Sequence, residues 1–393
     1  MTRQFVFVGR ITREKWFDRI LQSVYFLLQG GVDNFVIHVY GSGDMQEELK
    51  AHVGYGKHLI YHGRVPKEEF LEQWKTYQYT LMPSKFLETF GLVALDSLAL
   101  GVPVIGIKKG GLLPFVFDDL AVDSYEMFYT TLKTTITDFD PIVRKSQSDR
   151  CLQIAADYTM QTRVDRFTGL LPFSSNQDNK SLLLVSDYAV DIWGIEHYLL
   201  RVQELLSTHW RSITLRGKIR RVTGIWRKLD LLVACCNIPF LFRLCKDLVK
   251  NPTSLVRLHS IQRRIGWVPL LAFLFSKQQP VRVMYHDVGL LHPFPSKVYT
   301  EGQLAHASSF WGYLGEGRSV LAARHRLLTP GIVIVFGKWL YSKLIRFLLR
   351  KVADLHLVPS DYLIPYLQQQ MWPDHRIVTL AHFVSHARWW VNI

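Results

Sequence analysis

The sequence is poor in cysteine and has no long uninterrupted apolar run. Its four cysteines, Cys151, Cys235, Cys236 and Cys245, lack the spacing of metal ligands. The adjacent pair Cys235 and Cys236 is interpreted as buried strand residues. The longest apolar stretches, residues 229–242 and 265–275, contain polar or proline breaks or are too short to cross a bilayer. The chain opens on a strand-like segment and not on a signal peptide, so a cytoplasmic protein is expected.

Acidic residues are scarce in the second part of the chain. Residues 1–170 hold 19 Lys and Arg against 20 Asp and Glu, whereas the remainder holds 28 against 13, which accounts for the net charge of +14. A domain with this excess of positive charge favours an anionic partner. No nucleic-acid-binding motif accompanies the charge, so we expect no nucleic acid and favour an anionic membrane surface.

Two basic segments are interleaved with aromatic and aliphatic residues, at 208–228 and 338–351. The second has a helical period, with an apolar face formed by Leu340, Leu344, Phe347 and Leu348. Such a helix either lies on an anionic bilayer or packs on a sheet as an ordinary surface helix. For the domain as a whole, contact with the inner face of the cell membrane is expected.

Length and composition indicate a globular α/β protein. A chain of 393 residues with 48% hydrophobic and 20% charged residues favours two domains, each with its own core. Strand-like and helical segments alternate over the first 120 residues, which predicts a doubly wound parallel sheet.

Residues 82–111 carry the most specific pattern of the chain. They are interpreted as strand, loop, helix, strand and glycine turn, with Glu88 in the loop and Asp96 in the helix. The eight-residue step is just over two helical turns, which would place both carboxylates on about one face. The amides of Phe90, Gly91 and Leu92 come where the helix begins, a favourable place for a phosphate.

This pattern resembles the Glu-x7-Glu signature of retaining GT-B glycosyltransferases of the family-4 type, with Asp96 in place of the second glutamate. The resemblance implies a GT-B fold, with two Rossmann-like domains whose parallel sheets face a cleft. It also implies a hexosyltransferase that uses a nucleotide sugar. In that family the signature belongs to the second domain, whereas here it comes first.

The order of the segments therefore predicts a circular permutation. Residues 1–150 would form the nucleotide-sugar domain, 151–180 a crossing helix and linker, and 181–393 the basic acceptor-side domain, with new termini at the hinge. The later segments resemble strands of the family's acceptor domain in the matching cyclic order: 181–186, 281–287, 353–360 and 376–385. The alternative is that the two halves are unrelated domains.

The resemblance also implies the role of individual residues. Arg10 and Lys15, after a glycine turn at Gly9, match the diphosphate-binding basic pair. Glu88 matches the acid that holds donor-sugar hydroxyls, and Asp96 the acid that holds the ribose. The remaining donor-binding residues implied in this domain lie in base-proximal loops or at the helix start: Gly41, Gly43, Gly63, Arg64, Phe90, Gly91 and Leu92.

In the second domain, Gly194 would approach the diphosphate, and His286 matches a cleft histidine that contacts the transferred sugar. The family's mechanism is retaining: the leaving phosphate takes the acceptor's proton. No Asp-x-Asp motif is found in the candidate site, and neither a metal nor another cofactor is expected.

The resulting hypothesis is transfer of a sugar to a saccharide or lipid-linked acceptor in cell-envelope or exopolysaccharide synthesis. Two alternatives come from other classes. One is a non-catalytic relative that binds nucleotide sugars or membranes. Two departures from the family pattern keep it open: Asp96 in place of a glutamate, and Trp193 before Gly194 where the family usually has paired glycines. The other is a different enzyme on the same fold, such as a sugar-nucleotide epimerase or a phosphorylase.

Overall fold

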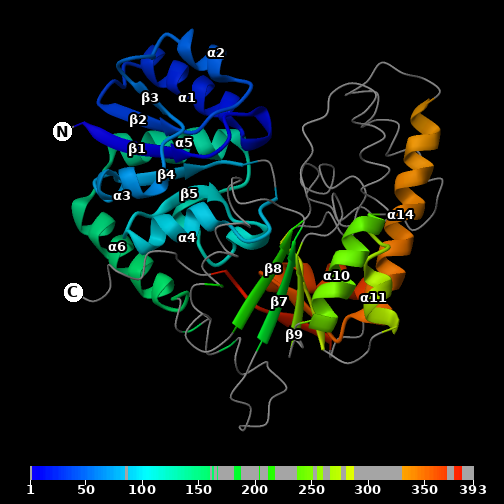
Figure 1. The fold of residues 1–393 in the computed structure, drawn as a ribbon. Coiled ribbons are helices and arrows are strands. Elements are labelled where there is room, and N and C mark those ends of the chain that lie inside the picture. The colour runs from blue at the N-terminus through cyan, green and yellow to red at the C-terminus, as the bar shows by residue number, and fades with distance from the viewer. Residues whose placement is uncertain are drawn as a thin grey trace. The chain divides into compact units, whose positions relative to one another are not determined.

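The structure is a computed structural model. It describes residues 2–84, 87–159, 181–186, 211–216, 237–250, 255–259, 266–275, 280–286, 330–369 and 376–382, and the single positions 162, 166 and 203. The chain forms two compact units, one of Met1–Arg163 with His382–Ile393 and one of Val164–Ala381 (Figure 1). Each unit contains its own parallel sheet.

Unit 1 is built on a six-stranded sheet in the order β3-β2-β1-β4-β5-β6, with all neighbours parallel. This is the strand order of doubly wound nucleotide-binding folds, whose direction of winding reverses between the first and fourth strands. The predicted parallel sheet is confirmed. The strands are β1 (Arg3–Val8), β2 (Phe35–Tyr40), β3 (Leu59–Gly63), β4 (Tyr79–Met82), β5 (Val104–Ile107) and β6 (Ala121–Val122).

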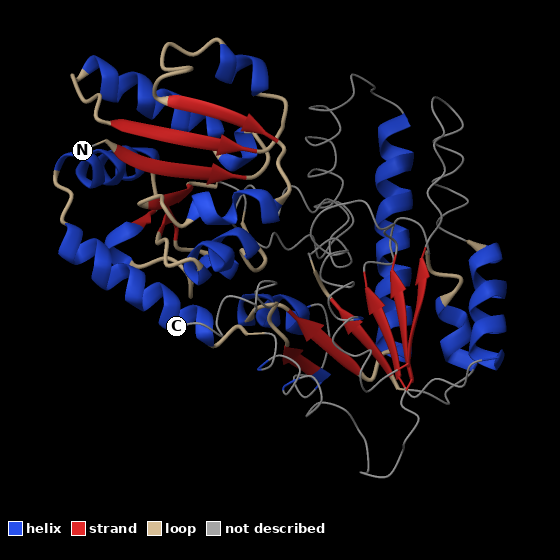
Figure 2. Cartoon of the chain, turned by 60° about the vertical axis from the view of Figure 1, so that its left-hand side comes forward, coloured by secondary structure: helices blue, strands red, loops and turns tan. Residues whose placement is uncertain are grey.

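Helices lie on both faces of this sheet (Figure 2). In α1 the buried residues Phe17, Ile20, Leu21, Val24 and Leu27 recur at helical spacing and form one core-facing stripe. The α-helices are α1 (Phe17–Gln29), α2 (Gln46–Lys50), α3 (Lys67–Trp74), α4 (Leu92–Ala99), α5 (Tyr125–Thr137) and α6 (Pro141–Ala156). Short 3-10 turns are η1 (Arg13–Lys15), η2 (Gly110–Leu112) and η3 (Asp118–Leu120).

A buried chain of hydrogen bonds fixes α4 against the sheet. The indole N–H of Trp74 donates to the Thr80 hydroxyl at 2.9 Å, and the hydroxyls of Thr80 and Ser97 lie 2.6 Å apart. Ser97 then donates to the carbonyl of Val102 at 2.7 Å. Because each buried hydroxyl is satisfied, the chain holds the helix at one height on β4.

Unit 2 has a second six-stranded parallel sheet, in the order β12-β11-β10-β9-β7-β8. The strands expected at 181–186, 281–287, 353–360 and 376–385 are all present. The bounds are β7 (Ser181–Ser186), β8 (Arg211–Arg216), β9 (Leu255–His259), β10 (Val281–Met284), β11 (Leu355–Val358) and β12 (Ile377–Thr379). Its described helices are α10 (Ile238–Lys250), α11 (Leu270–Phe275), α14 (Pro330–Val352), η5 (Asp361–Leu363) and α15 (Ile364–Gln369).

The helix expected at 338–351 is confirmed within α14, but its assumed apolar face is not a single buried face. Of the four residues assigned to that face, Leu348 is buried, whereas Leu340 and Phe347 are more than half exposed. The core side of α14 is instead formed by Ile345, Leu348, Leu349 and Val352. Apolar residues thus occur on the exposed side of α14, at Leu340 and Phe347, as well as on its buried side. The sequence pattern alone does not show which of these two sides faces the core.

The connection between the units begins at the end of unit 1. The helix α6 ends at Ala156, and the compact unit extends to Arg163. Most of the segment expected to cross over, and the polar linker at 172–180, lie outside the described residues. None of the described helices is long and apolar enough to span a membrane.

Candidate functional site

The loops after β1 and β2 pack backbone against backbone at the carboxyl edge of the unit 1 sheet. Gly9 N–H donates to the Tyr40 carbonyl and Ile11 N–H to the Ser42 carbonyl, each at 3.0 Å. A Cβ added at Gly41 would lie 1.8 Å from the Gly9 carbonyl oxygen, and one at Gly43 2.1 Å from that of Ile11. Such separations are shorter than any van der Waals contact, so only glycine fits.

The loop after β3 joins the same edge. Gly41 N–H donates to the Gly63 carbonyl at 2.7 Å, and Gly63 has a left-handed backbone with φ of 74°. The following residue, Arg64, is exposed. The four predicted glycines Gly9, Gly41, Gly43 and Gly63 therefore belong to one continuous loop cluster.

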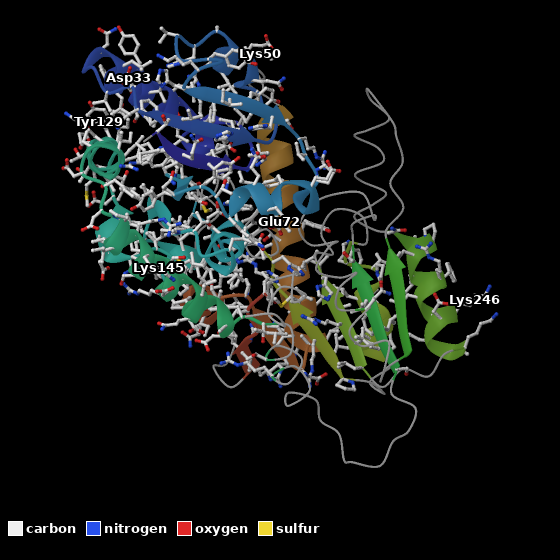
Figure 3. All side chains as sticks on the ribbon, turned by 90° about the vertical axis from the view of Figure 1, so that its left-hand side faces the viewer. Asp33, Lys50, Glu72, Tyr129, Lys145 and Lys246 are labelled. Atoms are coloured by element: carbon white, nitrogen blue, oxygen red, sulfur yellow. The ribbon has the colours of Figure 1, made fainter. Side chains whose placement is uncertain are left out.

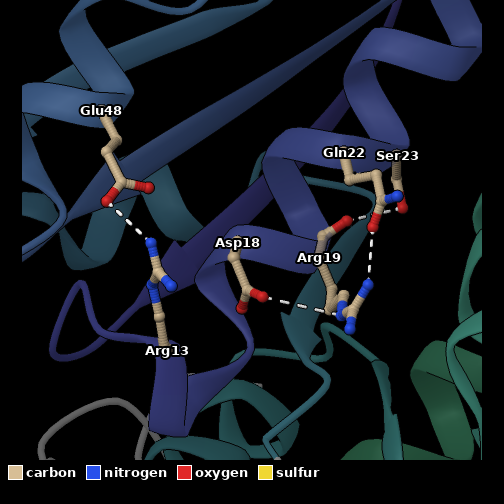
Figure 4. A network of polar contacts seen from close by, with 6 residues as sticks. All are labelled: Arg13, Asp18, Arg19, Gln22, Ser23 and Glu48. Atoms are coloured by element: carbon tan, nitrogen blue, oxygen red, sulfur yellow. Dashed lines mark hydrogen bonds and ion pairs between the residues drawn. The ribbon is translucent and has the colours of Figure 1, made fainter.

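Lys15 lies in a constrained turn between β1 and α1. The next residue, Trp16, has φ of 54° and is the one non-glycine with left-handed backbone among the described residues. This conformation costs about 1–2 kcal/mol for an L-residue. Arg13 of the same turn reaches Glu48 of α2 at 3.2 Å, and Arg19 pairs with Asp18 at 3.6 Å in the first turn of α1 (Figure 4).

Lys15 and Glu88 form an ion pair through Nζ and Oε1, and their side chains are 18% and 17% exposed. Glu88 comes from the loop between β4 and α4, 73 residues further along the chain. Partial burial reduces solvent screening, so this pair is stronger than an ordinary surface ion pair. The predicted base and acid are thus brought together where β1 and β4 end, at the reversal point of the sheet.

Paired glycines hold the Glu88 loop in place. Gly111 N–H donates to the Glu88 carbonyl at 2.8 Å, and a Cβ at Gly111 would lie 2.4 Å from the Cα of Phe90. Phe90 is buried and packs edge-on against Phe115. The loop is therefore fixed on its inner side by a close backbone contact and an aromatic anchor.

Helix α4 begins just after this loop. Its N-cap is Gly91, with φ of 92°, and none of the described side chains caps the first turn. The backbone amides of the first turn, which begins at the exposed residue Leu92, carry the positive end of the helix dipole. The helical step assumed between the two acids is corrected: Glu88 precedes the helix, and only the stretch from Leu92 to Asp96 is helical.

The other predicted basic residue, Arg10, is placed differently from Lys15. Its guanidinium lies 3.7 Å from the carboxylate of Glu14, and both side chains are largely exposed. Such a pair contributes little to stability and exchanges readily with another anion. Asp96 is half-buried on α4, one turn beyond the helix start.

Two histidines form a hydrogen-bonded pair near the β3 loop. His38 Nδ1 lies 2.9 Å from His62 Nε2, while His38 Nε2 lies 2.7 Å from Gln4 Oε1. Both rings stack on tyrosines, His62 on Tyr40 and His38 on Tyr77. Burial, together with the neighbouring His62, lowers the pKa of His38 to about 4, and burial lowers the pKa of His62.

The stability of unit 1 is expected to fall as the pH is lowered from about 6.5 to about 4. In this window His38 binds a proton in the unfolded chain but stays neutral in the folded protein, so protonation favours unfolding. Allowing for solvent screening of this half-buried ring, the loss is about 1–2 kcal/mol. Urea unfolding at pH 7 and pH 4.5 measures it, and His38→Gln should remove most of the difference. An unchanged difference in that variant would contradict the assignment.

In unit 2, the predicted cleft histidine has a partner that the sequence analysis missed. His286, just after β10, is buried, and its Nε2 lies 2.7 Å from Nδ1 of fully buried His259 at the end of β9. The parallel register of β9 and β10 places both residues at the carboxyl edge of the sheet. One proton shared in this contact fixes the ring orientation of His286. Gly194 lies outside the described residues.

For the transfer activity proposed below, removing the partner of His286 is expected to lower kcat more than it changes KM. His259→Leu deletes the hydrogen bond and should lower kcat about tenfold, the rate equivalent of about 1.4 kcal/mol. His259→Asn keeps a polar group near the Nδ1 position and should recover most of the rate. Steady-state kinetics of both variants, with circular dichroism to check folding, separate this positioning role from a loss of fold; equal rates in the two variants would contradict it.

Among the described residues, no three His, Cys, Asp or Glu side chains are grouped so that they could hold a metal ion. The candidate site of unit 1 therefore consists of the Lys15–Glu88 ion pair, a glycine loop cluster, the start of α4 and the His38–His62 pair. Fixed cations and amides of this kind can stabilise the charge of a phosphate or of a leaving diphosphate.

Comparison with known families bears on this same stretch of chain. Residues 1–120 match the family model for glycosyl transferases group 1. The group 1 match contains the loop cluster, Lys15, Glu88 and Asp96, and it confirms the resemblance of residues 1–120 to group 1 glycosyl transferases, while the retaining mechanism and the permutation stay predictions.

The curated proteins that resemble this chain match only part of it. An uncharacterised glycosyltransferase of Methanocaldococcus jannaschii is 29% identical over 117 residues, 29% of each protein. A D-inositol 3-phosphate glycosyltransferase 1 of Catenulispora acidiphila is 27% identical over 41% of this chain and 42% of the relative. A D-inositol 3-phosphate glycosyltransferase of Acidothermus cellulolyticus is 36% identical over 31% and 30%. The chain therefore spans well under half the length of these relatives.

Solved structures give weaker likenesses. The catalytic domain of cholesterol-α-glucosyltransferase from Helicobacter pylori aligns with a TM-score of 0.36 at 16% identity, over 40% of this chain and all of that one. The C-terminal domain of a glycosyl transferase group 1 family protein from Francisella tularensis aligns with a TM-score of 0.35 at 21% identity, over 39% and 84%. Neither adds to the assignment made from the group 1 match.

Proposed function

We propose that this chain is a retaining glycosyltransferase that moves a sugar from a nucleoside-diphosphate sugar to a saccharide or lipid-linked acceptor. The observation that carries the proposal is the Lys15–Glu88 ion pair. It lies after β1 and β4, where the strand order of the sheet reverses, which is where ligands bind in open α/β sheets. The group 1 match over residues 1–120 supports the same chemistry.

In this proposal the diphosphate contacts Lys15, Arg10 and the amides of Gly91 and Leu92. Its two negative charges would compete with Glu88 for Lys15, which frees the carboxylate to accept hydrogen bonds from the donor sugar. Asp96 would hold the ribose, and the loops at Gly41, Gly43 and Gly63–Arg64 would border the base. The carboxylates and the cations thus serve different parts of one donor, and no metal or other cofactor is required.

The transfer step breaks the bond between the anomeric carbon and the diphosphate oxygen. The acceptor oxygen forms its bond on the same face, and its proton passes to the departing phosphate. Fixed positive charge at Lys15 and Arg10 and the dipole of α4 stabilise the leaving group as it gains charge. His286 of unit 2 would contact the transferred sugar, with His259 holding its ring, and Gly194 would approach the diphosphate.

Circular permutation is part of the same proposal. After β12 the chain enters unit 1 again, and His382 packs edge-on against Phe90, two residues from Glu88, with ring centroids 5.1 Å apart. A chain that returns to the donor domain beside its site loop is what the permuted order requires. A rearranged protein with residues 181–393 before 1–163 should fold and bind the same nucleotide, and failure to bind would count against the permutation.

Contact with an anionic membrane at the cytoplasmic face is proposed from charge. The net charge of +14 comes from the part of the chain that forms unit 2. On α14, the exposed side chains of Leu340 and Phe347 accompany exposed Lys343, Arg350 and Lys351. An acceptor attached to a lipid at that face, as in cell-envelope or exopolysaccharide synthesis, would be consistent with this surface.

The stereochemistry of the product tests the proposed reaction. An α-linked donor offered with acceptor should give an α-linked product by proton NMR, whereas a β-linked product would contradict a retaining mechanism. A sugar altered while still attached to its nucleotide would indicate an epimerase. Nucleotide binding without any product would indicate the non-catalytic alternative.

A further inference from the structure

We propose that the outward side of α10 is a membrane-docking surface that lies on anionic phospholipid headgroups. This assigns the lipid contact of the proposed function, on which it rests, to one helix of unit 2. The surface consists of Ile238, Phe242, Cys245 and Val249, with lysines along its border, and is called the α10 stripe below.

The α10 stripe is defined by helical spacing and exposure. Its four residues stand at i, i+4, i+7 and i+11, so they lie in one row along the helix. Ile238, Phe242 and Val249 are 54%, 71% and 85% exposed, and Cys245 is also exposed. The opposite side of the same helix faces the core through buried Phe240 and Leu244.

The neighbouring helix α11 carries a further exposed aromatic side chain. Phe275, the last residue of α11, is 87% exposed, and α11 packs against α10. Phenylalanine side chains this exposed are unusual for a soluble surface, and apolar residues gathered in a row indicate a binding face. Burying such side chains in the acyl boundary of a bilayer would remove their apolar area from water.

The charges around the stripe select an anionic lipid surface as the occupant. Lys246 and Lys250 are exposed along its border, and Figure 3 shows Lys246 directed outward from α10. The one acid of the helix, Asp247, is half-buried and lies on the other side. An apolar row with cations at its edge, on a helix that exposes no acid of its own, matches a negatively charged headgroup layer.

The length of the helix agrees with lying in the plane of the interface. Thirteen residues extend about 20 Å, less than the hydrocarbon thickness of a bilayer. No described helix is able to span a membrane. Because Phe240 and Leu244 hold α10 against unit 2, only the α10 stripe would enter the headgroup region.

Vesicle co-sedimentation of the full chain tests the proposal. Vesicles of phosphatidylcholine with 30% phosphatidylglycerol are compared with phosphatidylcholine alone. Phe242→Ser combined with Val249→Ser should lower the partition coefficient for the anionic vesicles at least tenfold, and Lys246→Gln with Lys250→Gln should weaken binding and its dependence on salt. The matched control is Ile142→Ser on α6 of unit 1, an equally exposed apolar residue at 79%, which should leave binding unchanged.

A probe on the stripe makes the test local. Cys151 is buried, and burial raises the pKa of its thiol to about 12, so it should not react with a polarity-sensitive maleimide dye at neutral pH. With Cys235→Ser and Cys236→Ser, Cys245 then becomes the labelled position. A blue shift of dye emission on adding anionic vesicles is the expected result.

Three outcomes would overturn the proposal. The first is vesicle binding by the Phe242/Val249 variant as strong as that of wild type, and the second is no emission shift at Cys245 while the protein sediments with vesicles. The third is a wild-type protein that elutes as a dimer from size-exclusion chromatography while this variant elutes as a monomer, which would make the stripe a contact between copies. None of these readouts requires transferase activity. Vesicle binding together with absent activity would therefore refute the proposed function and not the docking surface.

Discussion

Replacing Glu88 by glutamine is expected to lower the rate of sugar transfer about 100- to 1,000-fold, the range measured when one group that stabilises a transition state is removed. The change keeps the size of the side chain but removes the charge that pairs with Lys15. Lys15→Met should cause a loss of similar size. The matched control is Glu47→Gln, because Glu47 forms an exposed ion pair with Lys50 in the same unit and should show full activity.

A double-variant cycle tests whether Lys15 and Glu88 act as a unit. If the pair is bound by one donor molecule, the double variant should be about as slow as the slower single variant, because groups that act together are not additive. Strictly additive losses would indicate that the two side chains serve separate steps. Full activity in Glu88→Gln would contradict the site assignment.

Replacing Gly43 by alanine is expected to reduce the free energy of unfolding by about 3 kcal/mol and to abolish nucleotide binding. The added methyl group would lie 2.1 Å from the Ile11 carbonyl oxygen, and this backbone contact can relax only if the β1 and β2 loops separate. Those loops border the proposed donor. Urea unfolding and nucleotide titration measure the two effects.

Two other glycines provide controls for this change. Gly31 has φ of 73° but no atom within 4 Å of an added Cβ, so Gly31→Ala should cost about 1–2 kcal/mol from backbone strain alone. Gly337 is exposed within α14 and has open space, so Gly337→Ala should raise stability by about 0.5–1 kcal/mol. If Gly43→Ala were as mild as Gly31→Ala, the close packing of the two loops would not be a structural requirement.

The strands of the two sheets, and the gathering of the predicted unit 1 residues at one sheet edge, were predictable because their signals are local. Buried parallel strands such as Phe35–Tyr40 are short, largely apolar runs, and Gly41 follows that strand directly. The residues Lys15 and Glu88 were predicted from a family pattern. Their direct pairing, however, depends on β1 and β4 being neighbours, which the pattern does not state.

Other features need information that a sequence period does not contain. His259 ends a strand with no motif around it, and only the register of β9 with β10 brings it to His286. In α10 and α14, apolar residues occur on both the core side and the outer side. The sequence therefore predicts an amphipathic or buried helix, while the choice of buried side follows from how each helix packs on its sheet.

The most direct test of the account is nucleotide release by the purified chain. A panel of nucleoside-diphosphate sugars is offered with a membrane lipid extract as acceptor, and wild type is compared with Lys15→Met and Glu88→Gln. The account predicts that wild type releases a nucleoside diphosphate from one donor and that both variants lose this release. Release that persists unchanged in both variants, or a wild type that binds no nucleotide at all, would contradict it.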